Sequence, residues 1–90
     1  MKFSGKVAIV TGGSRGIGKA TAKLFAQEGT NVVITARDET RLETSAKELN
    51  VIGIAGDIRK SQDVENVVKK TMEKFGRIDI LVNNAGIFPR

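Results

Sequence analysis

The stretch that decides the fold is KVAIVTGGSRGIG, residues 6–18, which joins an apolar run to a cluster of glycines. The run at residues 6–11 is short and has no helical spacing, so it predicts a buried strand of a parallel sheet. Residues 16–28 then predict a helix, and Gly29 is well placed to end it. The positions expected to pattern this helix are Ile17, Ala20, Leu24 and either Ala26 or Gln27. The stretch therefore indicates a strand, a glycine turn and a helix.

A second strand and a second helix follow. Residues 31–36 (NVVITA) are rich in β-branched side chains and predict a strand. Asp38 is placed to cap the next helix, because its carboxylate can accept a hydrogen bond from a backbone N–H group of the first turn. The apolar stripe expected on this helix is Leu42, Ala46 and Leu49.

The third unit has the same order. Residues 51–55 (VIGIA) predict a strand that is weakened by Gly53. Ser61 is expected to be the N-cap of the helix that follows, with Asp63 and Glu65 near its positive end. Its core-facing positions are expected to be Val64, Val67, Val68, Met72 and Phe75.

Gly76 is expected to stop the third helix, and residues 79–83 (DILVN) predict a fourth strand. Four strands that alternate with three helices favour right-handed crossovers, and hence an α/β fold with a doubly wound parallel sheet. The predicted strand order is 3-2-1-4, with the first two helices on one face and the third on the other. The sheet reverses direction between strands 1 and 4, and open α/β sheets bind ligands at such a switch point. This order is Rossmann-like.

Composition narrows the function classes. The 90 residues are 40% hydrophobic and 28% charged, which is typical of one globular unit. Cysteine, histidine and tyrosine are absent, so disulfides, thiolate chemistry, imidazole proton transfer and phenolic acid/base chemistry are excluded within these residues. With no leader and no long apolar run, we expect a cytoplasmic chain that does not enter a membrane. The net charge of +5 is scattered without interleaved aromatic residues, so nucleic-acid binding is not expected.

The glycine turn has more than one possible interpretation. Glycines can simply allow a tight turn, but four of them at a strand-to-helix junction favour backbone N–H groups that approach a phosphate. Residues 13–19 also fit G-x-x-x-x-G-K, the phosphate loop of ATPases and GTPases. That loop needs a hydroxyl at the next position to hold magnesium, where this chain has Ala20, and an Asp where the fourth strand ends in Asn83. We therefore expect no metal site. The G-x-G-x-x-G fingerprint also fails, because its sixth position counted from Gly16 is Thr21.

Three motifs in order carry a resemblance to a known family. TGGSRGIG at residues 11–18 matches T-G-x-x-x-G-x-G, GDI at 56–58 follows the third strand, and NNAG at 83–86 follows the fourth. In this combination and spacing the chain resembles the short-chain dehydrogenases/reductases over essentially all 90 residues. Within that family it is most similar to the 3-oxoacyl-carrier-protein reductase and sugar dehydrogenase branches.

The resemblance implies a set of cofactor contacts along the carboxyl ends of the strands. Asp57 and Ile58 would contact adenine, although Asp57 alone could equally cap its own loop. A side chain at Gly18 would spoil the packing of helix on strand, and Asn83 would have a structural role. The residues expected around the phosphates and the adjacent ribose are Gly12, Ser14, Arg15, Gly16, Ile17 and Gly18, and those near the inner ribose are Asn84, Ala85 and Gly86.

Arg37 bears on the choice of cofactor. NAD enzymes of this fold usually place an acidic residue at the end of the second strand, whereas this chain has Ala36 followed by Arg37. The resemblance adds Arg15 as a second cation that faces the same point, and a pair of guanidinium groups suits the 2′-phosphate of NADP. NADP(H) is therefore favoured over NAD(H). The alternative is a solvated Arg37 at a helix start, paired with Asp38.

The resemblance also implies an activity that these residues cannot complete. The family transfers hydride between nicotinamide and a carbonyl or alcohol, with a serine, a tyrosine, a lysine and an asparagine that all lie beyond the fourth strand. We expect no catalytic residue here and interpret residues 1–90 as the N-terminal dinucleotide-binding part of a single domain. The alternative is a non-catalytic dinucleotide-binding or partner-binding module. The edge of the fourth strand, with Ile80, Leu81 and Val82, is expected to pair with the rest of such a domain or with another copy.

Overall fold

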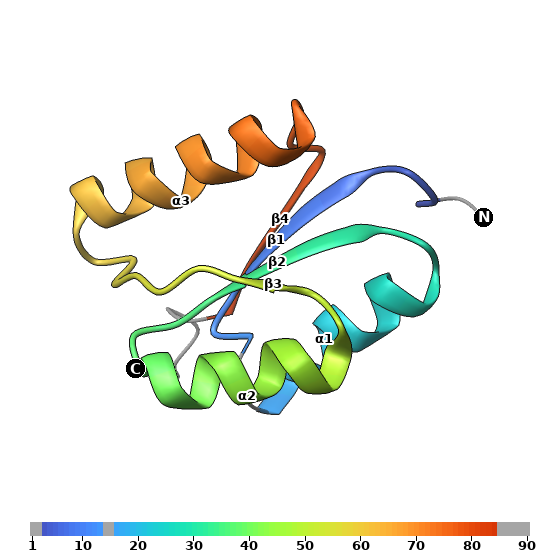
Figure 1. Ribbon diagram of the computed structural model, residues 1–90, viewed down its shortest axis with the longest axis horizontal. Helices are drawn as coiled ribbons and strands as arrows, with labels where there is room; N and C mark the ends of the chain where they lie inside the picture. The colour runs from blue at the N-terminus through green and yellow to red at the C-terminus, as the bar shows by residue number, and fades with distance from the viewer. Residues whose placement is uncertain (1–2, 14–15, 85–90) are drawn as a thin grey trace.

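The computed structural model describes residues 3–13 and 16–84, and within them it contains a four-stranded parallel sheet and three helices. The strand order is β3-β2-β1-β4, as the sequence predicts. Strands and helices alternate along the chain (Figure 1). The elements are β1 (Val7–Thr11), α1 (Gly16–Gln27), β2 (Asn31–Thr35), α2 (Glu39–Leu49), β3 (Ile52–Gly53), α3 (Ser61–Phe75) and β4 (Ile80–Asn83).

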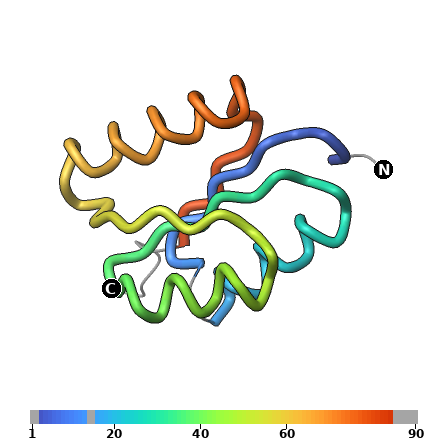
Figure 2. Tube along the Cα trace, viewed as in Figure 1, coloured from blue at the N-terminus to red at the C-terminus, as the bar shows by residue number. Residues whose placement is uncertain are grey.

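The helices form two layers around the sheet. α1 and α2 lie together on one face, and α3 alone covers the other (Figures 1 and 2). The sheet contributes apolar side chains to both layers because successive residues of a strand point to opposite faces. One core cluster contains Val10, Ala22, Val32, Ile34 and Leu42, and the other contains Ile9, Val33 and Val67. The doubly wound architecture is therefore confirmed.

β1 and β2 are the centre of the core. All five residues of β1 are buried, and so are the last four of β2. Their parallel register pairs Val7 with Asn31 and Thr11 with Thr35, and β4 is paired so that Thr11 also lies beside Asn83. The β-branched, uninterrupted apolar runs are what a strand needs when helices cover both of its faces.

The face that α1 presents to the core differs from the expected one. Ile17 and Leu24 are 78% and 64% exposed, whereas Gly18 and Ala22 are buried. The spacing of the larger apolar residues predicts the wrong buried face. The helix instead packs closely against the sheet through its small residues. An absent or single-carbon side chain at the contact lets the two backbones approach one another.

α3 also departs from its predicted details. Lys60, not Ser61, stands at the N-cap, with no side-chain hydrogen bond to the helix. Val67 and Thr71 are buried, whereas Val64, Val68 and Met72 are substantially exposed. Two of the exposed residues, Val64 and Val68, line a hollow together with Leu81 of β4, so they are not packed into the core. The predicted end of the helix is confirmed, since Gly76 has a φ of 78° and its N–H donates to the carbonyl of Met72.

The remaining boundaries follow local hydrogen bonds. β3 is shorter than the predicted strand at residues 51–55, but Ile54 still donates its N–H to the carbonyl of Ile34 at 3.0 Å. Asp38 caps α2 as predicted, because its carboxylate accepts from the N–H of Arg41 at 3.1 Å. Within residues 3–13 and 16–84, no helix combines the length and the apolarity that a bilayer span requires.

Candidate functional site

The candidate site is the edge of the sheet where the four strands end, here called the carboxyl rim. Gly12, directly after β1, donates its N–H to the carbonyl of Thr35 at 2.9 Å. Gly56, after β3, donates to the carbonyl of Ala36 at 3.0 Å. Asn84, after β4, donates to the Thr11 hydroxyl at 2.9 Å. These bonds bring the segments that follow all four strands side by side, although they are far apart in the sequence.

The glycine turn after β1 is tightly enclosed. Gly12 and Gly16 have positive φ angles of 68° and 62°, a backbone conformation that favours glycine. A side chain at Gly18 would overlap the carbonyl group of Gly12, so the start of α1 and the turn touch directly. The sequence interpretation assigned no role to Gly13, yet a Cβ there would lie 2.5 Å from Cγ2 of Ile34. Small residues are therefore required where the turn meets both helix and sheet.

The N-terminus of α1 points its first backbone N–H groups toward this turn. Gly16 and Ile17 begin the helix, and both are exposed. No acidic side chain lies in the first turn of α1, so the partial positive charge of the helix end is not neutralised there. Such an end attracts an anionic group. The expected contacts at Ser14 and Arg15 lie outside the described residues.

A row of polar side chains crosses the rim on the face covered by α3. Thr35, Thr11 and Asn83 are direct neighbours in the register of β2, β1 and β4. The Thr11 hydroxyl donates to Oδ1 of Asn83 at 3.1 Å and accepts from the N–H of Asn84. Asn83 thus ties the end of β4 to a side chain of β1. Sequence reasoning missed Thr11, and the fixed Thr of the TGGSRGIG motif was the available signal.

Two polar atoms at the rim are buried without a hydrogen-bond partner in the described part of the chain. They are the hydroxyl oxygen of Thr35 and Nδ2 of Asn84. Buried polar groups are normally paired, so an unpaired one often marks a ligand or a further protein contact. Ala85 and Gly86, which were expected to act with Asn84, lie outside the described residues.

Arg37 lies two residues after the end of β2 and is exposed. This exposure agrees with a solvated side chain, and Asp38, the partner considered for it, uses Oδ1 to accept from the N–H of Arg41 in the cap of α2. The charge of Arg37 does reach Asp57, on the neighbouring segment, and helps to lower the pKa of that carboxyl group.

Asp57 is held by a residue that the sequence interpretation did not assign. Its Oδ1 accepts from both the backbone N–H and Nε of Arg59 at 3.0 Å, and its Oδ2 accepts from Nη2 of Arg59 at 2.9 Å. The side-chain hydrogen bond from Arg59 is the main cause that lowers the pKa of Asp57 from 3.8 to about 2. The bond to the backbone of Arg59 is the loop-capping arrangement considered for this carboxylate. A carboxylate has about four acceptor sites, so Oδ2 can accept a further hydrogen bond.

A small hollow of about 180 Å³ lies between the rim and α3, here called the rim hollow. Asp57 and Ile58 line it, as does the unpaired Thr35 hydroxyl side chain. Its wall is otherwise mostly apolar, which suits a flat, weakly polar ring. The residues that line it are Ile9, Thr11, Thr35, Gly56, Asp57, Ile58, Asp63, Val64, Val67, Val68, Leu81 and Asn83.

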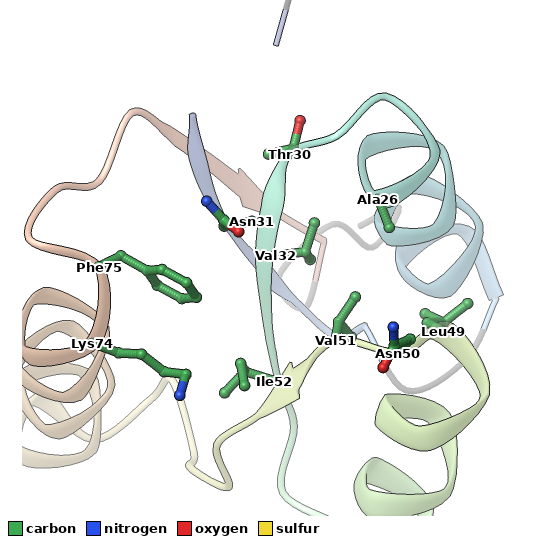
Figure 3. A pocket seen from close by; sticks show the side chains of 10 residues that line it. All are labelled: Ala26, Thr30, Asn31, Val32, Leu49, Asn50, Val51, Ile52, Lys74 and Phe75. Atoms are coloured by element: carbon green, nitrogen blue, oxygen red, sulfur yellow. The ribbon is translucent and has the colours of Figure 1, made fainter. Parts of the chain in front are cut away.

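A second hollow, of about 370 Å³, lies at the opposite end of the sheet and is here called the base hollow (Figure 3). Lys74 and Phe75 reach into it from the end of α3, opposite Asn50 and Val51 (Figure 3). None of the sequence-predicted site residues lines it. The helices end here, and the partial negative charge of helix C-termini disfavours phosphate. Its lining consists of Ala26, Thr30, Asn31, Val32, Leu49, Asn50, Val51, Ile52, Lys74 and Phe75.

Comparison with known proteins gives this rim a family context. A family model described as short chain dehydrogenase matches residues 6–90. An uncharacterized oxidoreductase of Thermotoga maritima is 46% identical over 94 residues, which cover 99% of this chain and 37% of that protein. L-fucose dehydrogenase of Bos taurus is 42% identical over 89 residues, which cover 98% of this chain and 33% of that protein.

The fold comparison agrees. The crystal structure of 3-ketoacyl-(acyl-carrier-protein) reductase from Brucella melitensis complexed with NADH superimposes with a TM-score of 0.90 at 46% identity. The match covers 94% of this chain and 36% of that chain. The chain thus spans about a third of the length of these relatives. Since the family model covers nearly every residue and the sheet order is the same as the family resemblance implies, the chain belongs to the short-chain dehydrogenase family.

Proposed function

We propose that this chain binds NADP(H) at the carboxyl rim, as the N-terminal dinucleotide-binding part of a Rossmann-fold oxidoreductase domain. The observation that carries the proposal is the contact between Gly18 and the carbonyl of Gly12, which brings the N-terminus of α1 directly against the glycine turn. Such contact leaves backbone N–H groups open to a phosphate with no side chain between. In the whole protein, bound nicotinamide would supply or accept the hydride that is exchanged with a carbonyl or alcohol substrate.

Each expected contact has a place in this proposal. The turn and the start of α1 hold the diphosphate, and the rim hollow takes the adenine between Ile58 and the apolar wall. Oδ2 of Asp57 accepts from the adenine amino group, and Asn84 lies on the nicotinamide side. The proposed cofactor contacts are Gly12, Ser14, Arg15, Gly16, Ile17, Gly18, Arg37, Asp57, Ile58, Asn84, Ala85 and Gly86.

The preference for NADP(H) rests on the end of β2. An acidic side chain that could bind a ribose 2′-hydroxyl is missing there, because Ala36 and Arg37 follow the strand. The nearest carboxylate along the chain, Asp38, is engaged with the N–H of Arg41 in the cap of α2. Arg37 is exposed and can therefore form a charge-assisted contact with a 2′-phosphate. The Brucella melitensis relative was crystallised with NADH, so the proposed preference depends on residues of this chain and not on that likeness.

Titration calorimetry with NADP⁺ and NAD⁺ tests this proposal. We expect tighter binding of NADP⁺, and Arg37→Asp should weaken NADP⁺ binding by about tenfold to a hundredfold, the range for loss of a charge-assisted hydrogen bond. Lys70→Asp, which changes the same number of charges on an exposed position of α3, should leave the ratio of the two affinities unchanged. Equal affinities that Arg37→Asp does not alter would contradict the proposed preference.

The second candidate is a nucleotide-binding module without catalysis. It is favoured by one observation, the absence of any tyrosine or histidine among the 90 residues. The two candidates differ in the coding sequence after Arg90. A Tyr-x-x-x-Lys motif downstream supports the oxidoreductase, and a stop codon directly after Arg90 supports the module.

A further inference from the structure

One part of the carboxyl rim carries three charged side chains, those of Arg37, Asp57 and Arg59. Arg37 follows β2, and Asp57 follows β3 on the segment that Gly56 binds to Ala36. Arg59 holds the far side of Asp57 through two side-chain hydrogen bonds of 3.0 and 2.9 Å. The carboxylate of Asp57 is therefore bound by one guanidinium group, and its segment is hydrogen-bonded to the segment that carries the other. The hydrogen bonds from Arg59 are the main cause of the lowered pKa of Asp57, and the charge of Arg37 adds a smaller effect in the same direction.

The negative charge of Asp57 opposes the binding of an anion beside Arg37. An ionised Asp57 offsets the positive charge of Arg37 and repels a dianionic phosphate at the same place. Protonation of Asp57 cannot remove this repulsion near neutral pH, since the pKa of Asp57 is about 2. Nor can the carboxylate turn away, because its side chain is only 13% exposed and is fixed by three hydrogen bonds from Arg59.

We propose that Arg59 is a specificity-determining residue for the phosphate-bearing cofactor, because it neutralises Asp57 and so keeps Arg37 available to the 2′-phosphate. This inference rests on the proposed binding of NADP(H) at the carboxyl rim. Arg59 acts through Asp57 and need not touch the cofactor. Its side chain is 71% exposed, so its role is not to fill the core. NAD⁺ lacks the 2′-phosphate and should be nearly indifferent to Arg59.

Charge counting gives an order that can be measured. With Arg37, Asp57 and Arg59 present, the local sum is one positive charge. Arg59→Gln lowers it to zero, Asp57→Asn raises it to two, and the double variant returns it to one. The ratio of NADP⁺ to NAD⁺ affinity should follow the same order. Arg59→Gln should lower this ratio by about threefold to tenfold, the range for one partly screened charge interaction.

The test is calorimetric titration of the full 90-residue chain and its variants with NADP⁺ and NAD⁺. Arg59→Lys retains the charge and should keep most of the ratio. The matched control is Arg77→Gln. Arg77 makes an equivalent pair with Asp79, with two hydrogen bonds of 2.8 Å, at the opposite end of the sheet. That substitution changes the net charge equally and should leave the ratio unchanged.

The outcomes separate this inference from the function on which it rests. A low ratio in Arg59→Gln that the double variant with Asp57→Asn restores, with NAD⁺ affinity nearly constant between the wild type and Arg59→Gln, supports the role of Arg59. If Arg59→Gln weakens both cofactors equally, or if Asp57→Asn fails to restore the ratio, the residue only orders its loop and the inference is wrong. If Arg37→Asp lowers the ratio while Arg59→Gln does not, the inference fails and the proposed function stands. A wild-type chain that does not prefer NADP⁺ overturns both.

Discussion

At the scale of single residues, the site depends on positions without a side chain as well as on the side chains that are present. Gly18 is buried in α1 against the carbonyl of Gly12, and the turn could not close over a larger residue. Gly56 provides a contrast, because a Cβ there would meet its nearest neighbours at 3.4 to 3.6 Å, which is ordinary contact. The two glycines therefore have different tolerances.

Gly18→Ala should lower the free energy of unfolding by about 1–3 kcal/mol, the usual effect of overpacking a closed site, and should weaken cofactor binding through the displaced turn. Gly56→Ala should change stability far less. Urea denaturation followed by circular dichroism compares the two variants. Equal stability of Gly18→Ala and the wild type would show that the turn is looser than described.

The ionisation of Asp57 gives a second prediction at this scale. Nuclear magnetic resonance titration of its carboxyl carbon should give a pKa of about 2, and Arg59→Gln should raise the pKa toward 3.8. A carboxyl group with a lowered pKa in the folded state contributes stability above 3.8, and this contribution is lost as the pH falls from 3.8 toward 2. Arg59→Gln should remove that pH-dependent part. An ordinary pKa in the wild type would contradict the observed ion pair.

At the scale of helices and strands, the two threonines in the row Thr35, Thr11 and Asn83 are expected to affect stability in opposite directions. Thr11 and Thr35 are neighbours in register and both are buried. The Thr11 hydroxyl connects β1 to β4, whereas that of Thr35 has no hydrogen-bond partner in the described residues.

Thr11→Val should therefore destabilise the fold by about 1–3 kcal/mol, because it leaves the partly buried N–H of Asn84 without its acceptor. Thr35→Val has the same shape change and should be neutral or stabilising, since it removes an unpaired buried hydroxyl. Denaturant unfolding of both variants gives the comparison, with Thr11→Ser as the control that retains a hydroxyl. Equal losses in the two valine variants would mean that Thr35 has a partner of its own.

The elements differ in how well the sequence predicts them. Strand order and helix layers could be predicted, because buried parallel strands are continuous β-branched runs and crossovers are right-handed. The buried face of α1 could not, since close packing through Gly18 and Ala22 overrides the larger Ile17 and Leu24. Ser61 failed as a cap because its loop is ordered by other contacts. Asp63 accepts a hydrogen bond from the N–H of Asp57 at 2.9 Å, and Arg59 holds the carboxylate of Asp57.

The residues of the site could also be predicted only in part. The motifs place Gly12, Asp57 and Asn84 at the rim, and the end of the second strand places Arg37 there, because these residues come shortly after strands. Arg59 and Thr11 went unassigned, since their contribution is a contact with another side chain whose geometry the spacing does not specify.

At the scale of the whole molecule, the sheet has one open apolar edge in the described residues. β4 is its last strand, and Leu81 is 66% exposed beside the exposed Val64 and Val68 of α3. An apolar strand edge favours pairing with another chain or segment. Leu24, with 64% exposure, lies in the opposite layer on α1 and is not beside this edge.

We predict that the 90-residue chain self-associates through this edge at high concentration. Leu81→Glu should shift the chain toward monomer in sedimentation velocity, because a charge on β4 opposes pairing. Leu24→Glu removes an equally exposed leucine and should leave the association unchanged. A wild-type chain that stays monomeric at all concentrations, or equal effects of the two variants, would contradict the prediction.

The central claim is that the dinucleotide occupies the carboxyl rim. Titration of the ¹⁵N-labelled chain with NADP⁺, followed amide by amide, tests it most directly. We predict saturable chemical-shift changes at Gly12, Gly18, Arg37 and Asp57, with little change around Phe75 in the base hollow. Changes confined to the base hollow, or no change at any concentration in a folded chain, would contradict it.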